Sequence, residues 1–193
     1  MSEQFEHIDV IINNAGVLKT PEPITVDKLD VRFAVNTVAP YIITTELLSK
    51  LNQHGRVINL SSAAQANVDL NALVGKVFID QAFEAYAQSK LAILMWNNHL
   101  ASLYPNGPQF IALNPGSLLA SKMVKEGFGM AGKDINIGVQ SMLKTAHAEE
   151  LAGKTGVYFD NDIGEISAPH VDASNPARCA ELVSTLENLL SKH

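Results

Sequence analysis

The sequence predicts an α/β fold in which a parallel sheet is covered by helices on both faces. Short apolar segments alternate with longer segments of helical periodicity along the 193 residues, which is the pattern of parallel strands joined by crossover helices. The apolar segments do not alternate with polar residues, as expected for strands buried on both faces. No repeat or linker interrupts the pattern, so we expect one α/β domain over residues 1–193.

The expected strands cover residues 8–13, 57–60, 110–113 and 156–159. The expected helices run from near residue 25 to 51 and over residues 82–104, 135–148 and 176–190. Asp27 would lie in the first turn of the first helix, where the helix dipole favours a negative charge, and Pro40 should kink that helix. Residues 63–81 are expected to form a loop with some local helix, and residues 117–133 a mobile loop rich in Gly and Met.

Composition excludes several classes of function. The formal net charge is −6 and no cluster of Lys or Arg stands out, which argues against nucleic acid or anionic membrane as a partner. The single cysteine, Cys179, favours a reducing, cytoplasmic setting. The polar, acidic start is not typical of a signal or transit peptide, and no apolar run approaches the roughly 20 residues that span a bilayer. The histidines show no metal-ligand spacing, so no metal is expected.

Tyr86 and Lys90 form the sharpest chemical pattern, in the segment YAQSK of the expected 82–104 helix. A spacing of four residues places both side chains on one helix face. A neighbouring ammonium should lower the tyrosine pKa from its ordinary value of about 10 toward neutral pH, so that the side chain can exchange a proton with a substrate. Taken alone, this pair is more typical of a solvated helix surface than of a catalytic site.

Polar and glycine residues follow three of the expected strands, at the edge where open parallel sheets bind ligands. These residues are Asn14-Ala15-Gly16, Ser61-Ser62 and Pro115-Gly116. The Ser62 hydroxyl could bind a substrate carbonyl or simply end a strand, while glycine permits close approach of backbone to a ligand. Asn36 is a poor helix former inside a helical segment; it could hold a water at a helix kink or be an exposed polar residue.

In chain order these motifs are NNAG, an Asn in the next helix, Ser-Ser after the next strand, YxxxK in the next helix and NPG after the next strand. Their order and context resemble the short-chain dehydrogenase/reductase superfamily from about residue 8 to 159; each motif is weak but the joint match is specific. The 24-residue interval from Ser62 to Tyr86, with AYAQSKLA and LNPGSLLASKM, resembles the retinol-dehydrogenase-like and WW-domain-oxidoreductase-like branch.

The resemblance implies an NAD(P)-dependent oxidoreductase that acts on a carbonyl or secondary alcohol. It implies Tyr86 as acid/base, Lys90 as its pKa-lowering partner, Ser62 as the residue that orients the substrate oxygen, and Asn36 as the holder of a water in a proton relay. The residues implied to bind the nicotinamide half of NAD or NADP are Asn14, Ala15, Gly16, Tyr86, Lys90, Pro115, Gly116 and Ser121, the last uncertain by one residue. A lid containing Met123, Val124 and Phe128 would cover an apolar substrate.

The sequence departs from the family pattern before NNAG, because neither GxGxxG nor TGxxxGxG occurs. The expected fold is therefore a partial Rossmann-like sheet that lacks the first βαβαβ portion, about 60 residues or more. Without a glycine turn and helix N-terminus for the pyrophosphate, cofactor binding is expected to be weak or absent. The 8–13 strand would become an exposed edge, which predicts a homo-oligomer through that edge or another polypeptide that covers it.

Three interpretations remain open at this point. The chain is an active oxidoreductase, or an inactive truncated member of the family that oligomerises or binds partners, or part of a protein whose upstream segment is missing from this sequence. An unrelated flavodoxin-like domain would predict no particular closeness of Ser62, Tyr86 and Lys90. The sequence identifies neither the substrate, nor NAD against NADP, nor the oligomeric state.

Overall fold

The protein, described over residues 6–191 by a computed structural model, is built on a five-stranded sheet. The strands lie in the order β1 (Ile8–Asn13), β2 (Leu51–Leu60), β3 (Gln109–Asn114), β4 (Val157–Asp160) and β5 (Glu165–Ser167). The first four are parallel, which confirms the predicted α/β, Rossmann-like class. The fifth pairs antiparallel with β4 and was not predicted, because three residues are too few to show a period.

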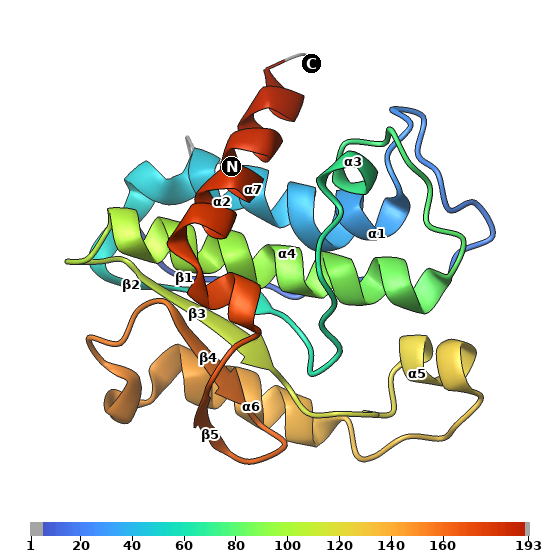
Figure 1. The fold of residues 1–193 in the computed structure, drawn as a ribbon. Coiled ribbons are helices and arrows are strands. Elements are labelled where there is room, and N and C mark those ends of the chain that lie inside the picture. The colour runs from blue at the N-terminus through green and yellow to red at the C-terminus, as the bar shows by residue number, and fades with distance from the viewer. Residues whose placement is uncertain (1–5, 192–193) are drawn as a thin grey trace.

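Helices cover both faces of the sheet (Figure 1). One face carries α1 (Val31–Phe33), α2 (Ala39–Leu47), α4 (Ala82–Leu103) and α7 (Pro176–Leu190), and the other carries α6 (Asn136–His147). Two short helices, α3 (Leu70–Leu73) and α5 (Lys122–Phe128), lie in the connections that follow β2 and β3. Within residues 6–191, each helix is too short or too polar to cross a membrane.

The hydrophobic core is divided between the two faces. The larger cluster lies under α4 and α7 and includes the fully buried Trp96, Phe33 and Phe110. The smaller cluster lies under α6 and is centred on Ile58 and Phe159. Helix α4 is therefore the most firmly packed element and gives its side chains fixed positions.

The helix expected from residue 25 to 51 is shorter than predicted at both ends. Helix α1 begins at Val31, because the Asp30 side chain accepts a hydrogen bond from the Arg32 N–H (2.8 Å) and caps the helix there instead of Asp27. A π-helical turn over Ala34–Val38 precedes Pro40, which marks the predicted kink. Residues 48–50 form a 3₁₀ turn, and β2 already begins at Leu51, which pairs with Ile8.

The other predicted elements agree with the structure within a few residues, except that β2 begins six residues before the predicted 57–60 strand. The predicted strands all lie at observed strands, and the 82–104, 135–148 and 176–190 helices end within one residue of α4, α6 and α7. The 63–81 loop contains α3, as expected. The 117–133 segment, predicted as a mobile loop, instead contains α5, which the Ser121 side chain caps by accepting from the Val124 N–H at 3.2 Å.

Candidate active site

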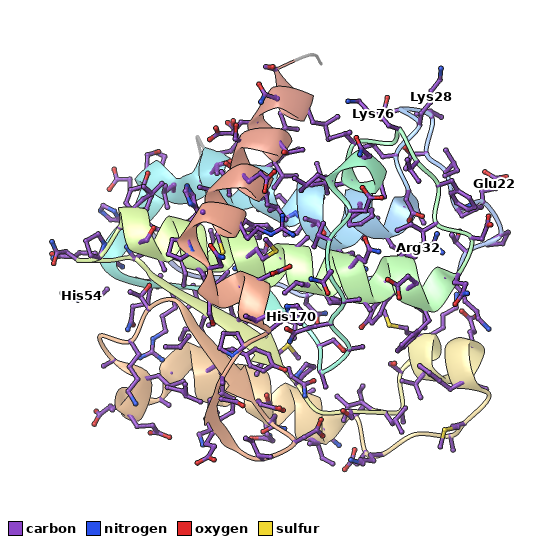
Figure 2. All side chains as sticks on the ribbon, viewed as in Figure 1. Glu22, Lys28, Arg32, His54, Lys76 and His170 are labelled. Carbon is purple, nitrogen blue, oxygen red and sulfur yellow. The ribbon has the colours of Figure 1, made fainter. Side chains whose placement is uncertain are left out.

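A cavity of about 830 Å³ opens at the carboxyl ends of β1, β2 and β3, between α4, α5 and α6. The predicted site residues that line it are Asn14, Gly16, Ser62, Tyr86, Lys90, Pro115, Gly116 and Ser121. His54, which lies in the first half of β2, marks the end of the sheet opposite to α5 and the cavity (Figure 2). The structure thus gathers the motifs into one place, as the parallel topology predicts.

Ser62 and Tyr86 both line the cavity, and the Ser62 side chain is close enough to the Tyr86 hydroxyl to act on its pKa. Lys90 lies one helical turn after Tyr86, and its Nζ is 5.7 Å from the centroid of the Tyr86 ring. The same Nζ donates to the carbonyl oxygen of Leu60, the last residue of β2, at 2.6 Å. These three side chains therefore converge, which an unrelated flavodoxin-like domain would not require.

The pKa shift of Tyr86 beside Lys90 differs from the one predicted from the sequence. Burial raises the pKa of Tyr86 above its ordinary value, and the polar side chain of Ser62, which acts to lower that pKa, does not offset this effect. Burial also lowers the pKa of Lys90 to about 8. The net shift of the Tyr86 pKa is thus opposite in sign to the predicted one, because burial disfavours the phenolate form of the side chain.

Asn36 is fully buried, not an exposed polar residue, and its side chain supports the NNAG loop. Its Oδ1 accepts from the Val17 N–H at 2.8 Å, and its Nδ2 donates to the Val17 carbonyl and to the Ser89 hydroxyl, both at 2.9 Å. Its own main-chain carbonyl lacks an α-helical donor, because the residue four positions on is Pro40. Asn36 thus joins the loop after β1 to α4 but does not itself line the cavity.

Asn13 anchors the end of β1 that carries the NNAG loop. Its Nδ2 donates to the Thr44 hydroxyl at 3.0 Å and to Asn59 Oδ1 at 2.7 Å, and Asn59 in turn donates to Asn97 on α4 at 2.9 Å. These hydrogen bonds between side-chain amides connect β1, β2 and α4 beneath the cavity. Ala15 lies in the same loop but does not line the cavity.

The turn after β4 holds the NPG loop in a way that the sequence analysis missed. Asn114 Nδ2 donates to Asp160 at 2.8 Å and to Asp162 at 2.9 Å, and the Ser117 N–H also donates to Asp162 at 2.9 Å. Partial burial acts to raise the pKa of Asp162, but the hydrogen bonds from Ser117 and Asn114 outweigh it and lower that pKa. The position of both aspartates just after a parallel strand was the signal that could have identified them.

An apolar wall completes the cavity. The Phe83 ring stacks on Tyr86 with centroids 6.4 Å apart and meets the Phe128 ring edge-on at 6.0 Å. Met123, Val124 and Phe128, the residues predicted to form a lid, line the cavity from α5. Tyr86 therefore has a polar partner in Ser62 and an apolar partner in Phe83.

The fold and the site together define an α/β domain of the dehydrogenase type. The chain belongs to the short-chain dehydrogenase family, whose family model, described as short chain dehydrogenase, matches residues 1–131. This match covers the cavity residues from Asn14 to Phe128.

Curated relatives include several retinol dehydrogenases. The chain is 32% identical over 195 residues to retinol dehydrogenase 13 of Homo sapiens, covering 91% of this chain and 59% of that protein. It is 33% identical over 168 residues to retinol dehydrogenase 12 of Mus musculus, covering 80% of this chain and 52% of that protein. The predicted retinol-dehydrogenase-like branch is confirmed, and the chain spans a little over half the length of these relatives.

Solved structures show the same fold. An uncharacterised protein from Mycobacterium paratuberculosis matches with a TM-score of 0.77 at 23% identity, over 97% of this chain and 69% of that one. The landomycin C-6 ketoreductase LanV, solved with bound NADP and rabelomycin, matches with a TM-score of 0.55 at 27% identity, over 82% of this chain and 61% of that one.

Proposed function

We propose that the protein is an NAD(P)-dependent oxidoreductase that interconverts a carbonyl and an alcohol, with Tyr86 as the acid/base. The observation that carries the proposal is the convergence of Ser62, Tyr86 and the buried Lys90 on one cavity that is large enough for a small substrate, with Lys90 Nζ 5.7 Å from the centroid of the Tyr86 ring. Bound NAD(P) would supply or accept the hydride. Proton transfer and the binding of the substrate oxygen are assigned to residues of this chain.

In the direction of reduction, Tyr86 donates its proton to the substrate oxygen while the Ser62 hydroxyl hydrogen-bonds the same atom. The raised pKa of Tyr86 keeps it protonated at neutral pH, which suits a proton donor. In the direction of oxidation Tyr86 has to act as phenolate, and the Lys90 ammonium stabilises that anion. Asn36 is assigned an indirect role, which is to hold a water that returns the proton from solvent.

The residues present fit the nicotinamide end of the cofactor. Lys90 is 4% exposed, and its ammonium has a single acceptor among the described residues, Leu60 O, so two N–H groups remain for ribose hydroxyls. Gly116, at φ +119°, brings the NPG backbone to the cavity in a conformation that L-residues rarely adopt. Asn14, Gly16, Pro115 and Ser121 are proposed to complete this half of the site, with Ala15 in the same loop.

The adenosine end has no corresponding support among residues 6–191. No strand, glycine turn and helix precede β1 in the described part of the chain, so weak or absent cofactor binding stays a prediction. The NADP bound in the landomycin ketoreductase supports a nicotinamide cofactor without deciding between NAD and NADP.

We propose a small apolar substrate. Phe83, Leu118, Val139 and Met142 supply an apolar wall beside Tyr86, and the names of the curated relatives refer to retinol. A chain with an apolar pocket and few polar contacts selects by size and shape more than by hydrogen bonding.

The test is reduction of apolar aldehydes and ketones, retinal included, followed through loss of NADPH or NADH absorbance. Tyr86→Phe should lower kcat at least 100-fold, since general acid catalysis contributes factors of about 10² to 10⁴. Tyr104→Phe removes a tyrosine hydroxyl that does not line the cavity and serves as the control. A Tyr86→Phe rate equal to that of the unmodified chain would contradict the assignment, and no turnover with any substrate would favour the inactive, partner-binding alternative.

We also propose that two copies associate through β1. This strand is at the edge of the sheet, its Ile12 side chain is 41% exposed, and its one charged residue, Asp9, is already hydrogen-bonded by Asn52 at 2.7 Å. An open apolar edge is a template for strand pairing. Sedimentation should give a dimer that Ile12→Lys dissociates, and a monomer at all concentrations would exclude it. A cytoplasmic location likewise stays a prediction.

A further inference from the structure

The main-chain carbonyl of Ser62 is held by two side chains from outside the predicted motifs. The Tyr158 hydroxyl, on β4, donates to it at 3.2 Å, and Gln65 Nε2 donates to it at 2.9 Å. Tyr158 is 5% exposed, and burial, together with the nearby Asp160 carboxylate, raises its pKa, so it stays a hydrogen-bond donor across the working pH range. Two donors on one carbonyl fix the orientation of the Ser62 peptide.

The Ser62 hydroxyl is itself constrained by the same turn. The Ala64 N–H donates to Ser62 Oγ at 3.1 Å, which occupies one acceptor position and leaves the hydroxyl hydrogen free to point at Tyr86 or a substrate oxygen. A hydroxyl that accepts one hydrogen bond becomes a stronger donor for the next. The direction in which Ser62 donates therefore depends on the geometry of residues 62–64.

Gln65 connects this turn to the C-terminal segment. Its Oε1 accepts from the His170 N–H at 3.4 Å, and the His170 ring accepts from the Asp172 N–H at 3.2 Å. Figure 2 shows His170 at the start of the segment that leads into α7, beside the chain that follows β2. The segment after β5, distant in sequence from every predicted motif, thus contacts the turn that carries Ser62.

We propose that Tyr158 and Gln65 are positioning residues that aim the Ser62 hydroxyl by binding its main-chain carbonyl. This inference rests on the proposed role of Ser62 and extends the site to β4 and residues 168–172. Neither side chain lines the cavity, so neither touches the substrate. Their effect passes through the Ser62 peptide alone.

The first test needs no turnover. Tyr158→Phe keeps the buried ring and removes the donor to Ser62, so amide hydrogen exchange at Ala64, whose acceptor is Ser62 Oγ, should accelerate about five- to tenfold. Exchange at Ile111 in the middle of β3 reports global stability and should not change by this factor. Tyr41→Phe, which removes a buried tyrosine hydroxyl bonded to Glu187 far from the site, is the matched control. Unchanged exchange at Ala64 in Tyr158→Phe would overturn the proposal.

The second test uses Gln65→Glu and a pH profile. The protonated carboxyl can still donate to the Ser62 carbonyl, whereas the carboxylate repels it. We expect kcat to fall about tenfold above the pKa of the new carboxyl and to recover below it, with KM little changed. A merely structural role of Gln65 would not produce this additional pH-dependent step in kcat. A plot of kcat against pH that runs parallel to that of the unmodified chain would overturn the proposal. If no substrate turns over, the proposed function fails by itself, and exchange at Ala64 in Gln65→Glu, compared with the unmodified chain at each pH, still decides this inference.

Discussion

The two faces of the sheet are built differently: the proposed catalytic residues Tyr86 and Lys90 belong to the face with the larger hydrophobic core. Under α4 and α7 lies the larger core, and α4 buries residues on nearly every side. Under α6 lies a smaller cluster, and the β1 strand on that side leaves Ile12 41% exposed. The predicted acid/base pair stands on the face with the larger core, while α6, which helps to wall the cavity, stands on the face with the smaller one.

This arrangement suits a site in which a proton is transferred over hydrogen-bond distances. Tyr86 and Lys90 need fixed positions, because small displacements of reacting groups cost large factors in rate. The apolar wall from α5 and α6 needs only to exclude water and to accept a substrate by shape. We therefore expect substitutions on the α4 face to change stability strongly, and those on the exposed α6 surface to change it little.

The largest effect on stability is expected at Trp96, which is fully buried in the α4 face and meets Tyr41 edge-on at 5.8 Å. Trp96→Ala should lower the free energy of unfolding by about 3–5 kcal/mol. Leu143→Ala, on an exposed position of α6, should change it by less than about 0.5 kcal/mol. Urea unfolding measures both, and similar losses for the two would remove the contrast between the faces.

Lys90 should make stability depend on pH. Its pKa is about 8 in the folded chain against 10.5 ordinarily, so the unfolded chain binds more protons between these values. The free energy of unfolding should therefore rise with pH across this window, by about 3 kcal/mol in full, and the penalty should be complete below pH 8. The measurement is the difference in stability between the unmodified chain and Lys90→Met from pH 7 to 9.5. A constant difference would mean that Lys90 is not buried as a cation.

Arg56 joins the α6 face to the sheet. Its guanidinium donates to Gln109 Oε1 at 3.0 Å and to the carbonyls of Thr145 and Ala148 at 2.9 and 2.8 Å, near the end of α6. Arg56→Met should cost about 2 kcal/mol, because buried acceptors lose their donors. Hydrogen exchange should increase in α6 more than in α4. Equal increases in both helices would show that the two faces unfold as one unit.

Apart from the Leu143 control, Gly116 gives the smallest expected change in stability. Its φ of +119° strains any other residue, although its nearest atoms, from 3.6 Å, leave room for a methyl group. Gly116→Ala should cost about 1–2 kcal/mol, from backbone strain alone. Circular dichroism during thermal unfolding checks this value, and a neutral substitution would mean that the NPG loop adopts another conformation.

The parts of the fold that the sequence predicted are those with long local patterns. The 22 residues of α4 and the apolar segments of the strands show hydrophobic patterns long enough to predict these elements from the sequence. The start of β2 at Leu51 depends on pairing with Ile8, and the start of α1 depends on a turn closed by the Val31 N–H and the Pro23 carbonyl at 2.8 Å. Contacts of this kind are set by tertiary structure and leave no local period.

The candidate site was predictable as a set of motifs but not as an electrostatic environment. The NNAG, Ser-Ser, YxxxK and NPG segments meet at one cavity because parallel strands share a carboxyl edge. The sign of the Tyr86 pKa shift was missed, because burial from Phe83 and neighbouring segments is a property of the folded chain. Tyr158 and Asp162 were missed because their contacts join segments about 45 to 100 residues apart.

The central claim is that residues of this chain form the nicotinamide half of a dinucleotide site beside Tyr86. The most direct measurement is a titration of the ¹⁵N-labelled chain with reduced nicotinamide mononucleotide, NADH, NADPH and ADP-ribose, followed at the amides of Gly16 and Gly116. We expect saturable shifts at both glycines with the mononucleotide, weak affinity similar to that of the dinucleotides, and no shift there with ADP-ribose. Shifts with ADP-ribose alone, or none with any nicotinamide at millimolar concentration, would contradict it.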